Sequence, residues 1–183
     1  MDFCQIIENL KNESFDDLQQ EDIAMLISCP KEIADPNKKP RFSSKRNAYR
    51  ELKFTLHSVE QNEIVYFAYV NQSLQSPENF SIVLMLQLPS QNYTLFRCNG
   101  KHNEPKATNI WHAQYHTHTL SVDDIQHGRT SDPDFKSLAS YRSIPSAIDY
   151  FITTCNIMGL KEQLPNELKA DNLLTRQITM DEM

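Results

Sequence analysis

The chain has 183 residues, a length that allows one domain with a substantial hydrophobic core. Hydrophobic residues make up 39% and charged residues 23%, a balance typical of a soluble globular protein. Its three glycines are too few and too far apart for a P-loop or a dinucleotide-binding fingerprint, and no apolar run approaches the roughly 20 residues of a membrane span.

The N-terminus is acidic and lacks the basic start of a signal peptide, so we expect a cytoplasmic protein that does not associate with a membrane. The four cysteines form no CxxC pair, and they indicate neither a zinc ribbon nor a thioredoxin-like motif. In a reducing compartment we expect them to be free and mainly buried. No cofactor is expected.

The net charge of −6 is unevenly distributed along the chain. Residues 1–35 carry nine acidic residues against two lysines, whereas residues 38–53 carry seven basic residues against one acid. Such a basic segment can hold a phosphate backbone or an acidic partner. The alternative is a solvated linker that offsets the acidic helices beside it. The residues that we expect to contact nucleic acid are Lys38, Lys39, Arg41, Lys45 and Arg46.

The first predicted elements are two amphipathic helices, over residues 3–10 and 14–29. Pro30, Pro36 and Pro40 then break the pattern, which predicts a connector. We therefore expect three parts: an N-terminal helical arm over residues 1–36, an α+β core domain over 37–160 and a polar tail over 161–183.

Alternating apolar residues predict strands over 50–59, 63–72, 80–89, 92–100 and 110–120. The third is almost wholly apolar, so we expect a central strand that is buried on both faces. In the fifth, alternation places His112, His116 and His118 on one face. Consecutive strands joined by short loops favour an antiparallel sheet.

Two helices complete the prediction. Ser121 and Asp124 fit the start of a short helix that ends near Gly128. A longer helix begins near Pro145, ends before Gly159 and should pack across the sheet. The expected fold is thus α+β: an antiparallel sheet of about five strands packed against a C-terminal helix, with the N-terminal helical arm.

Five polar residues fall near the ends of two strands that we expect to be neighbours: Arg97, Asn99, His102, His116 and His118. Histidine can act as both general base and general acid near neutral pH, and a guanidinium can stabilise the charge of a phosphorane. The group therefore predicts a catalytic site for phosphodiester chemistry without a metal. Tyr141 and Arg142 are expected to close this site, whereas Cys98 should face the core.

Two other interpretations of these residues remain open. His116 and His118 could bind a metal with a third ligand from Asp123, Asp124 or His102, although Leu120 departs from the HxHxDH pattern of metal hydrolases. Alternatively, the histidines line a polar strand face and Arg97 pairs with an acid such as Asp123.

The segments YTLFRCNGKHNEP, YHTHTLSVDDIQHG and SLASYRSIPSAIDYFITTCNI resemble, in this order, an uncharacterised bacterial domain family. Its pattern is a strand ending in Arg-x-Asn-Gly, a His-Asn loop, a His-x-His-x-Thr strand, and then Tyr-Arg before a helix ending in Cys-Asn-Ile. The resemblance covers about residues 29–160. More distantly, the chain is similar to the TumE-type toxins of bacterial toxin–antitoxin pairs.

The resemblance implies five functional positions: Arg97, Asn99, His102, His116 and His118. The chain departs from the toxin pattern at Cys98, where an aromatic residue is common, and after His118, where Thr119-Leu120-Ser121 replaces an Ala-Thr-Glu-like segment. The acid of that segment is displaced to Asp123 or Asp124.

Three functional hypotheses follow, and the sequence leaves open whether the chain is an enzyme. The first is a bacterial defence or toxin–antitoxin protein that cleaves or modifies RNA through the histidine and arginine residues. The second is a non-enzymatic inhibitor or antitoxin-like protein that docks a protein partner on the acidic arm. A homodimer is compatible with either, and a metal-binding hydrolase is the third hypothesis.

Overall fold

The structure is a computed structural model that describes residues 1–45, 48–102 and 110–169, without the side chains of Lys45, Ile110 and His112. Its helices are α1 (Phe3–Lys11), α2 (Gln20–Ser28), α3 (Val122–Gln126), α4 (Ile144–Cys155) and α5 (Leu160–Gln163), with the 3-10 helices η1 (Ile110–Ala113) and η2 (Asn166–Leu168). Its strands are β1 (Lys31–Ile33), β2 (Ser43–Lys45), β3 (Tyr49–Ser58), β4 (Val65–Ser73), β5 (Phe80–Gln87), β6 (Asn92–Asn99), β7 (His116–Thr119), β8 (Phe135–Leu138) and β9 (Ile157–Met158).

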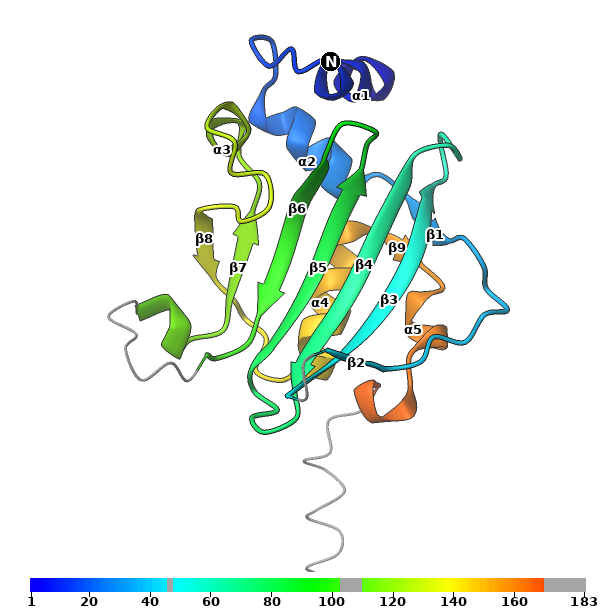
Figure 1. Cartoon of the computed structure of the whole chain (residues 1–183), viewed down its shortest axis with the longest axis vertical. Helices are drawn as coiled ribbons and strands as arrows, with labels where there is room; N and C mark the ends of the chain where they lie inside the picture. The colour runs from blue at the N-terminus through cyan, green and yellow to red at the C-terminus, as the bar shows by residue number, and fades with distance from the viewer. Residues whose placement is uncertain (46–47, 103–109, 170–183) are drawn as a thin grey trace, which may run out of the picture.

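One sheet contains all of these strands, in the order β8-β7-β6-β5-β4-β3-β1-β9, with β2 beside β3 (Figure 1). Its pairs are antiparallel except β1–β9. The predicted α+β class with an antiparallel sheet is confirmed. Within the described residues the sheet has nine strands rather than about five. The additional strands have two to four residues each, too few to produce a clear alternating pattern.

The fifth predicted strand is shorter than expected. Only residues 116–119 are extended, whereas residues 110–113 form the 3-10 helix η1. His112 therefore does not lie on the strand that carries His116 and His118, and its side chain lies outside the described part of the chain.

Helices α2 and α4 cover one face of the sheet and lie behind it in Figure 1. The ring of Phe96 on β6 stacks on that of Phe151 on α4, with 6.3 Å between the ring centroids. We call the opposite side the open face. Val83 and Met85 of β5 point to it and are only half-buried. The prediction that this strand is buried on both faces is therefore wrong, although it is central.

The segment predicted as an N-terminal arm contributes to the same hydrophobic core as the sheet. Ile6, Leu10, Ile23 and Leu26 of α1 and α2 are fully buried in that cluster. The predicted connector contains β1, and its Lys31 is opposite Ser58 of β3. Residues 1–36 thus belong to the packing that positions the sheet.

The predicted helices after the sheet are confirmed as α3 and α4. The Ser121 hydroxyl accepts a hydrogen bond from the Asp124 amide, and the Asp124 carboxylate accepts one from the Ser121 amide. This capping box begins α3. Among the described residues, no helix is long and apolar enough to span a bilayer.

A glycine is required where β6 ends. A Cβ atom on Gly100 would lie 1.9 Å from the main-chain oxygen of Glu78 and 2.7 Å from Phe80 Cδ1. The Gly100 amide also donates a hydrogen bond to Phe80 O, at 2.9 Å. This close approach of backbone segments positions the chain that leads into His102.

Candidate functional site

The candidate site lies on the open face of two adjacent strands. β6 and β7 pair so that Arg97 is opposite His118 and Asn99 is opposite His116. Because successive side chains alternate between faces, these four point away from Phe96 and the helices. The prediction that these four residues lie together on neighbouring strands is therefore confirmed. The main-chain pairing of β6 and β7 sets their relative positions.

Both ring nitrogens of His116 are engaged. Nδ1 lies 2.9 Å from Gln114 O and must donate to this carbonyl, and Nε2 lies 3.2 Å from Asn99 Nδ2, from which it accepts. The side chain is 1% exposed. These contacts fix the orientation of the imidazole. Both ring nitrogens are thus used within the protein, and the catalytic role expected for His116 stays a prediction.

Tyr141 stabilises this pair from the helix side of the sheet. Its hydroxyl donates to His116 O at 2.7 Å and approaches Asn99 O at 3.1 Å. Burial raises the pKa of this phenol. Tyr141, which we expected to close the site from the last helix, instead holds the two strands together through their main chains.

His118 is the best-placed proton acceptor. Its Nδ1 donates to Pro133 O at 2.7 Å, which leaves a lone pair on Nε2, and Nε2 makes no hydrogen bond with any other described residue. The pKa of His118 is lowered to about 4, mainly by burial and also by the positive charges of Arg97 and Lys136, against the opposing effect of the Pro133 hydrogen bond. The ring is therefore neutral at pH 7.

This shift predicts a pH dependence of stability. The folded pKa lies below the ordinary value of about 6.5, so between these values the unfolded chain binds a proton that the folded chain does not. The free energy of unfolding should fall as pH decreases through this window, by about 2–3 kcal/mol at pH near 4.5. The measurement is urea unfolding of wild type and His118→Asn at pH 7 and at pH near 4.5. Between these two pH values wild type should lose about 2–3 kcal/mol more of its free energy of unfolding than His118→Asn does.

The matched control for that experiment is His127→Asn. His127 is the C-cap residue that follows α3, and its side chain is 60% exposed. This variant should lose as much stability between the two pH values as wild type does. An equal loss in His118→Asn and wild type would contradict the shifted pKa.

Arg97 has a partly satisfied guanidinium. Nη1 pairs with Asp132 Oδ1 at 3.1 Å and Nη2 donates to Ser131 O at 3.0 Å. The predicted partner Asp123 instead pairs with Arg129 and His127. Within the described chain, Arg97 Nε is buried without a hydrogen-bond partner.

Besides Arg97 Nε, the site contains one unpaired polar atom of Asn99. While its Nδ2 donates to His116, its Oδ1 is buried without a partner among the described residues. The site thus contains one unpaired donor, Arg97 Nε, and one unpaired acceptor, Asn99 Oδ1. Each unpaired buried polar atom lowers the free energy of unfolding by about 1–3 kcal/mol.

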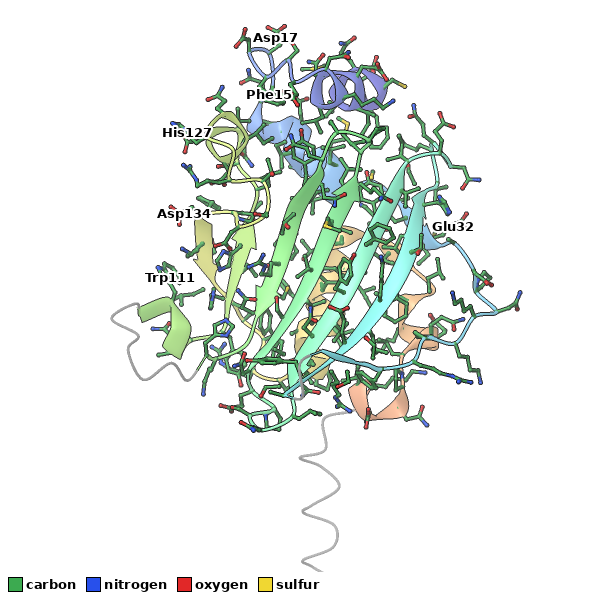
Figure 2. The ribbon with its side chains drawn as sticks, in the orientation of Figure 1. Phe15, Asp17, Glu32, Trp111, His127 and Asp134 are labelled. Atoms are coloured by element: carbon green, nitrogen blue, oxygen red, sulfur yellow. The ribbon has the colours of Figure 1, made fainter. Side chains whose placement is uncertain are left out.

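His102 also lies beside this group. Its Nδ1 lies 3.0 Å from Asn79 Oδ1, and its ring centroid is 5.8 Å from that of His116. The ring of Trp111 is 6.3 Å from that of His116. In Figure 2, Trp111 and Asp134 lie at the β7–β8 end of the sheet. All five predicted catalytic residues are thus in one region.

A pocket of about 270 Å³ lies next to the five candidate residues but is lined by none of them. Its lining residues are Lys101, Ala113, Gln114, Tyr115, Leu138, Ala139 and Arg142. Arg142, expected to close the site, instead faces this pocket. Its Nη1 donates to Ala139 O and Tyr141 O.

Cys98 faces the core, as predicted, and is fully buried. Burial raises the pKa of its thiol well above the ordinary value. A thiol in this state is a poor nucleophile, because the thiolate is the reactive form.

Three of the five predicted nucleic-acid residues lie on one described segment. Lys38, Lys39 and Arg41 are exposed on the connector before β2. The side chain of Lys45 and all of Arg46 lie outside the described residues.

The strand β3 divides the rest of the basic segment between the two faces of the sheet. Arg50 points to the helix side, where it pairs with Glu167 at 2.6 Å. Lys53 points to the open face.

No group of three or more His, Cys, Asp or Glu side chains is placed to hold a metal ion in residues 1–45, 48–102 and 110–169. The orienting groups Gln114, Asn79 and the loop 131–133 were not predicted from sequence. They act through main-chain carbonyls or long-range contacts, for which the sequence carries no local signal. The dipeptide Asp132-Pro133 indicates only a turn.

Comparison of the chain with protein-family models, curated proteins and solved structures finds no match.

Proposed function

We propose that this protein cleaves RNA without a metal, using Arg97 and His118 as its principal catalytic residues. The observation that carries the proposal is the register that sets Arg97 opposite His118 on adjacent strands, with His118 Nε2 left as an acceptor and Arg97 Nη1 paired only with an exposed carboxylate. RNA offers complementary groups in one nucleotide, an anionic phosphate oxygen and a 2′-hydroxyl. A bacterial defence or toxin–antitoxin role, which the sequence resemblance implies, belongs to the same proposal.

Phosphate binding requires the displacement of Asp132. This carboxylate is 78% exposed, and such surface ion pairs contribute only about 0–1 kcal/mol. It places an anionic oxygen on the Arg97 guanidinium, as a phosphodiester would. A bound phosphate also opposes the cations that lower the pKa of His118, and so raises the basicity of its Nε2.

The reaction then follows from these positions. His118 Nε2 takes the 2′-hydroxyl proton, and the 2′-oxygen forms a bond to phosphorus while the bond from phosphorus to the 5′-oxygen breaks. His102, which is half-buried, gives a proton to the departing 5′-oxygen. Arg97 stabilises the negative charge of the phosphorane. The products are a 2′,3′-cyclic phosphate and a 5′-hydroxyl.

Docking of a protein on the acidic segment, the alternative function, has less support. The apolar stripes of α1 and α2 are used inside the chain's own core, and Asp22 is 3% exposed and pairs with the terminal amine at 3.3 Å. This acid therefore supports the fold rather than a partner surface.

The test is cleavage of end-labelled RNA in excess chelator by wild type and Arg97→Lys. The lysine keeps the charge but loses the planar donor set, so we expect cleavage to slow about 100-fold. Arg50→Lys is the matched control, since Arg50 pairs with Glu167 on the helix side of the sheet, opposite to the face that carries the site. Its rate should equal that of wild type. Equal rates for all three proteins, or no cleavage in chelator, would refute the proposal.

A further inference from the structure

One straight row of side chains crosses the open face and includes the candidate site. Each member is opposite the next in the strand register, so the row has a span of about 24 Å at the usual strand spacing. We call it the cross-strand row. Its members are Lys53, Tyr69, Val83, Arg97, His118 and Lys136.

The β3–β4 end of this row is an aromatic surface. Tyr69 and its neighbour Phe67 are half-buried, with 6.0 Å between ring centroids. Lys53 Nζ lies over both rings, 3.7 Å from the Phe67 centroid and 5.4 Å from that of Tyr69. Exposed contacts of this kind are weak, so a flat ligand can displace the ammonium from the rings.

The row also complements a polyanion. It contains three cations, Lys53, Arg97 and Lys136, and no acid. The carboxylates that pair with two of them, Asp132 and Asp134, are 78% and 70% exposed and come from one loop. Neither is held inside the fold, so phosphates can replace both.

We infer that the cross-strand row binds single-stranded RNA, with bases stacked on Tyr69 and Phe67 and the backbone led along the cations to His118. This inference rests on the proposed function and identifies its substrate class. Stacking requires unpaired bases, and alternating stacking and phosphate contacts are typical of single-strand binding surfaces. A duplex hides its base faces and cannot use the aromatic end.

The test measures binding of a labelled 2′-O-methyl RNA of about twelve nucleotides, a length within the usual range of single-strand sites and resistant to cleavage at the 2′-oxygen. The double variant F67A/Y69A should bind about ten-fold to a hundred-fold more weakly than wild type. The ring-conserving variant F67Y/Y69F should retain wild-type affinity. F135A, which removes a 61% exposed ring from the edge strand β8, is the control and should also bind normally.

Equal affinity of F67A/Y69A and wild type, or equal binding of the single strand and its duplex, would overturn the inference and favour a protein interface on this face. Loss of affinity in F67Y/Y69F as large as in F67A/Y69A would also overturn it, since that result means disrupted packing. Cleavage is measured separately. If RNA binding depends on the two rings but no cleavage occurs, this inference is supported and the catalytic proposal is refuted. If cleavage occurs but RNA binding does not depend on the two rings, the catalytic proposal is supported and this inference is refuted.

Discussion

Replacement of His118 by asparagine is expected to slow RNA cleavage about 100-fold to 10,000-fold, the usual contribution of a positioned general base. Asparagine can reproduce the donor that His118 Nδ1 presents to Pro133 O, so the loop stays anchored. It has no counterpart of Nε2, and the 2′-hydroxyl loses its proton acceptor. The measurement is the initial rate of cleavage at saturating RNA in excess chelator.

The control for this variant is His127→Asn. His127 donates through Nδ1 to Asp123 O, so the substitution changes the same kind of contact at an exposed position. We expect a wild-type rate. The affinity of His118→Asn for a 2′-O-methyl RNA should fall far less than its cleavage rate, because Arg97 and the aromatic rings at one end of the cross-strand row are retained. Undiminished cleavage by His118→Asn would exclude this residue as the base.

Replacement of Lys31 by methionine is expected to lower the free energy of unfolding by about 2–4 kcal/mol. Lys31 is 0% exposed, and its Nζ donates to Ile27 O at 2.7 Å, Cys29 O at 2.8 Å and Cys155 O at 3.2 Å. These carbonyls lie at the C-terminal ends of α2 and α4, where a cation is favourable. Methionine fills the space but leaves the oxygens unpaired.

The comparison variant is Lys161→Met, which removes an exposed ion pair with Asp149. Its free energy of unfolding should differ from that of wild type by about 0.5 kcal/mol or less. Urea unfolding at pH 7 measures both. Burial lowers the pKa of Lys31, so part of the gain from its hydrogen bonds is offset by desolvation. A stability of Lys31→Met equal to wild type would mean that this offset is complete.

The elements that could be predicted from the sequence are those whose residues form a recognisable pattern over a short stretch of the chain. β3, β4, β5 and β6 have eight to ten residues each, long enough for alternation to be visible. Ser121 and Asp124 identify α3 because a capping box is a contact over three residues. Lys31 shows the limit: it follows Pro30 in an apparent connector, yet it joins two helices that are more than a hundred residues apart.

The site divides in the same way. The pairing of Arg97 with His118 was accessible because β6 and β7 are consecutive strands and alternation fixes their faces. The surroundings of the two histidines were not accessible from sequence. His116 is occupied by Asn99 and Gln114, and the low pKa of His118 depends mainly on its burial and also on Arg97 and Lys136 of the flanking strands. The cross-strand row needs the register of six strands, which no short segment encodes.

The most direct test of RNA cleavage at this site is an end-group analysis of the products. Wild-type protein is incubated in excess chelator with a single-stranded RNA and with the DNA of the same sequence. We predict that the RNA alone is cut and that its fragments carry a 2′,3′-cyclic phosphate and a 5′-hydroxyl, because His118 activates the 2′-oxygen. Uncut RNA, cut DNA, or fragments ending in a 3′-hydroxyl and a 5′-phosphate would contradict this mechanism.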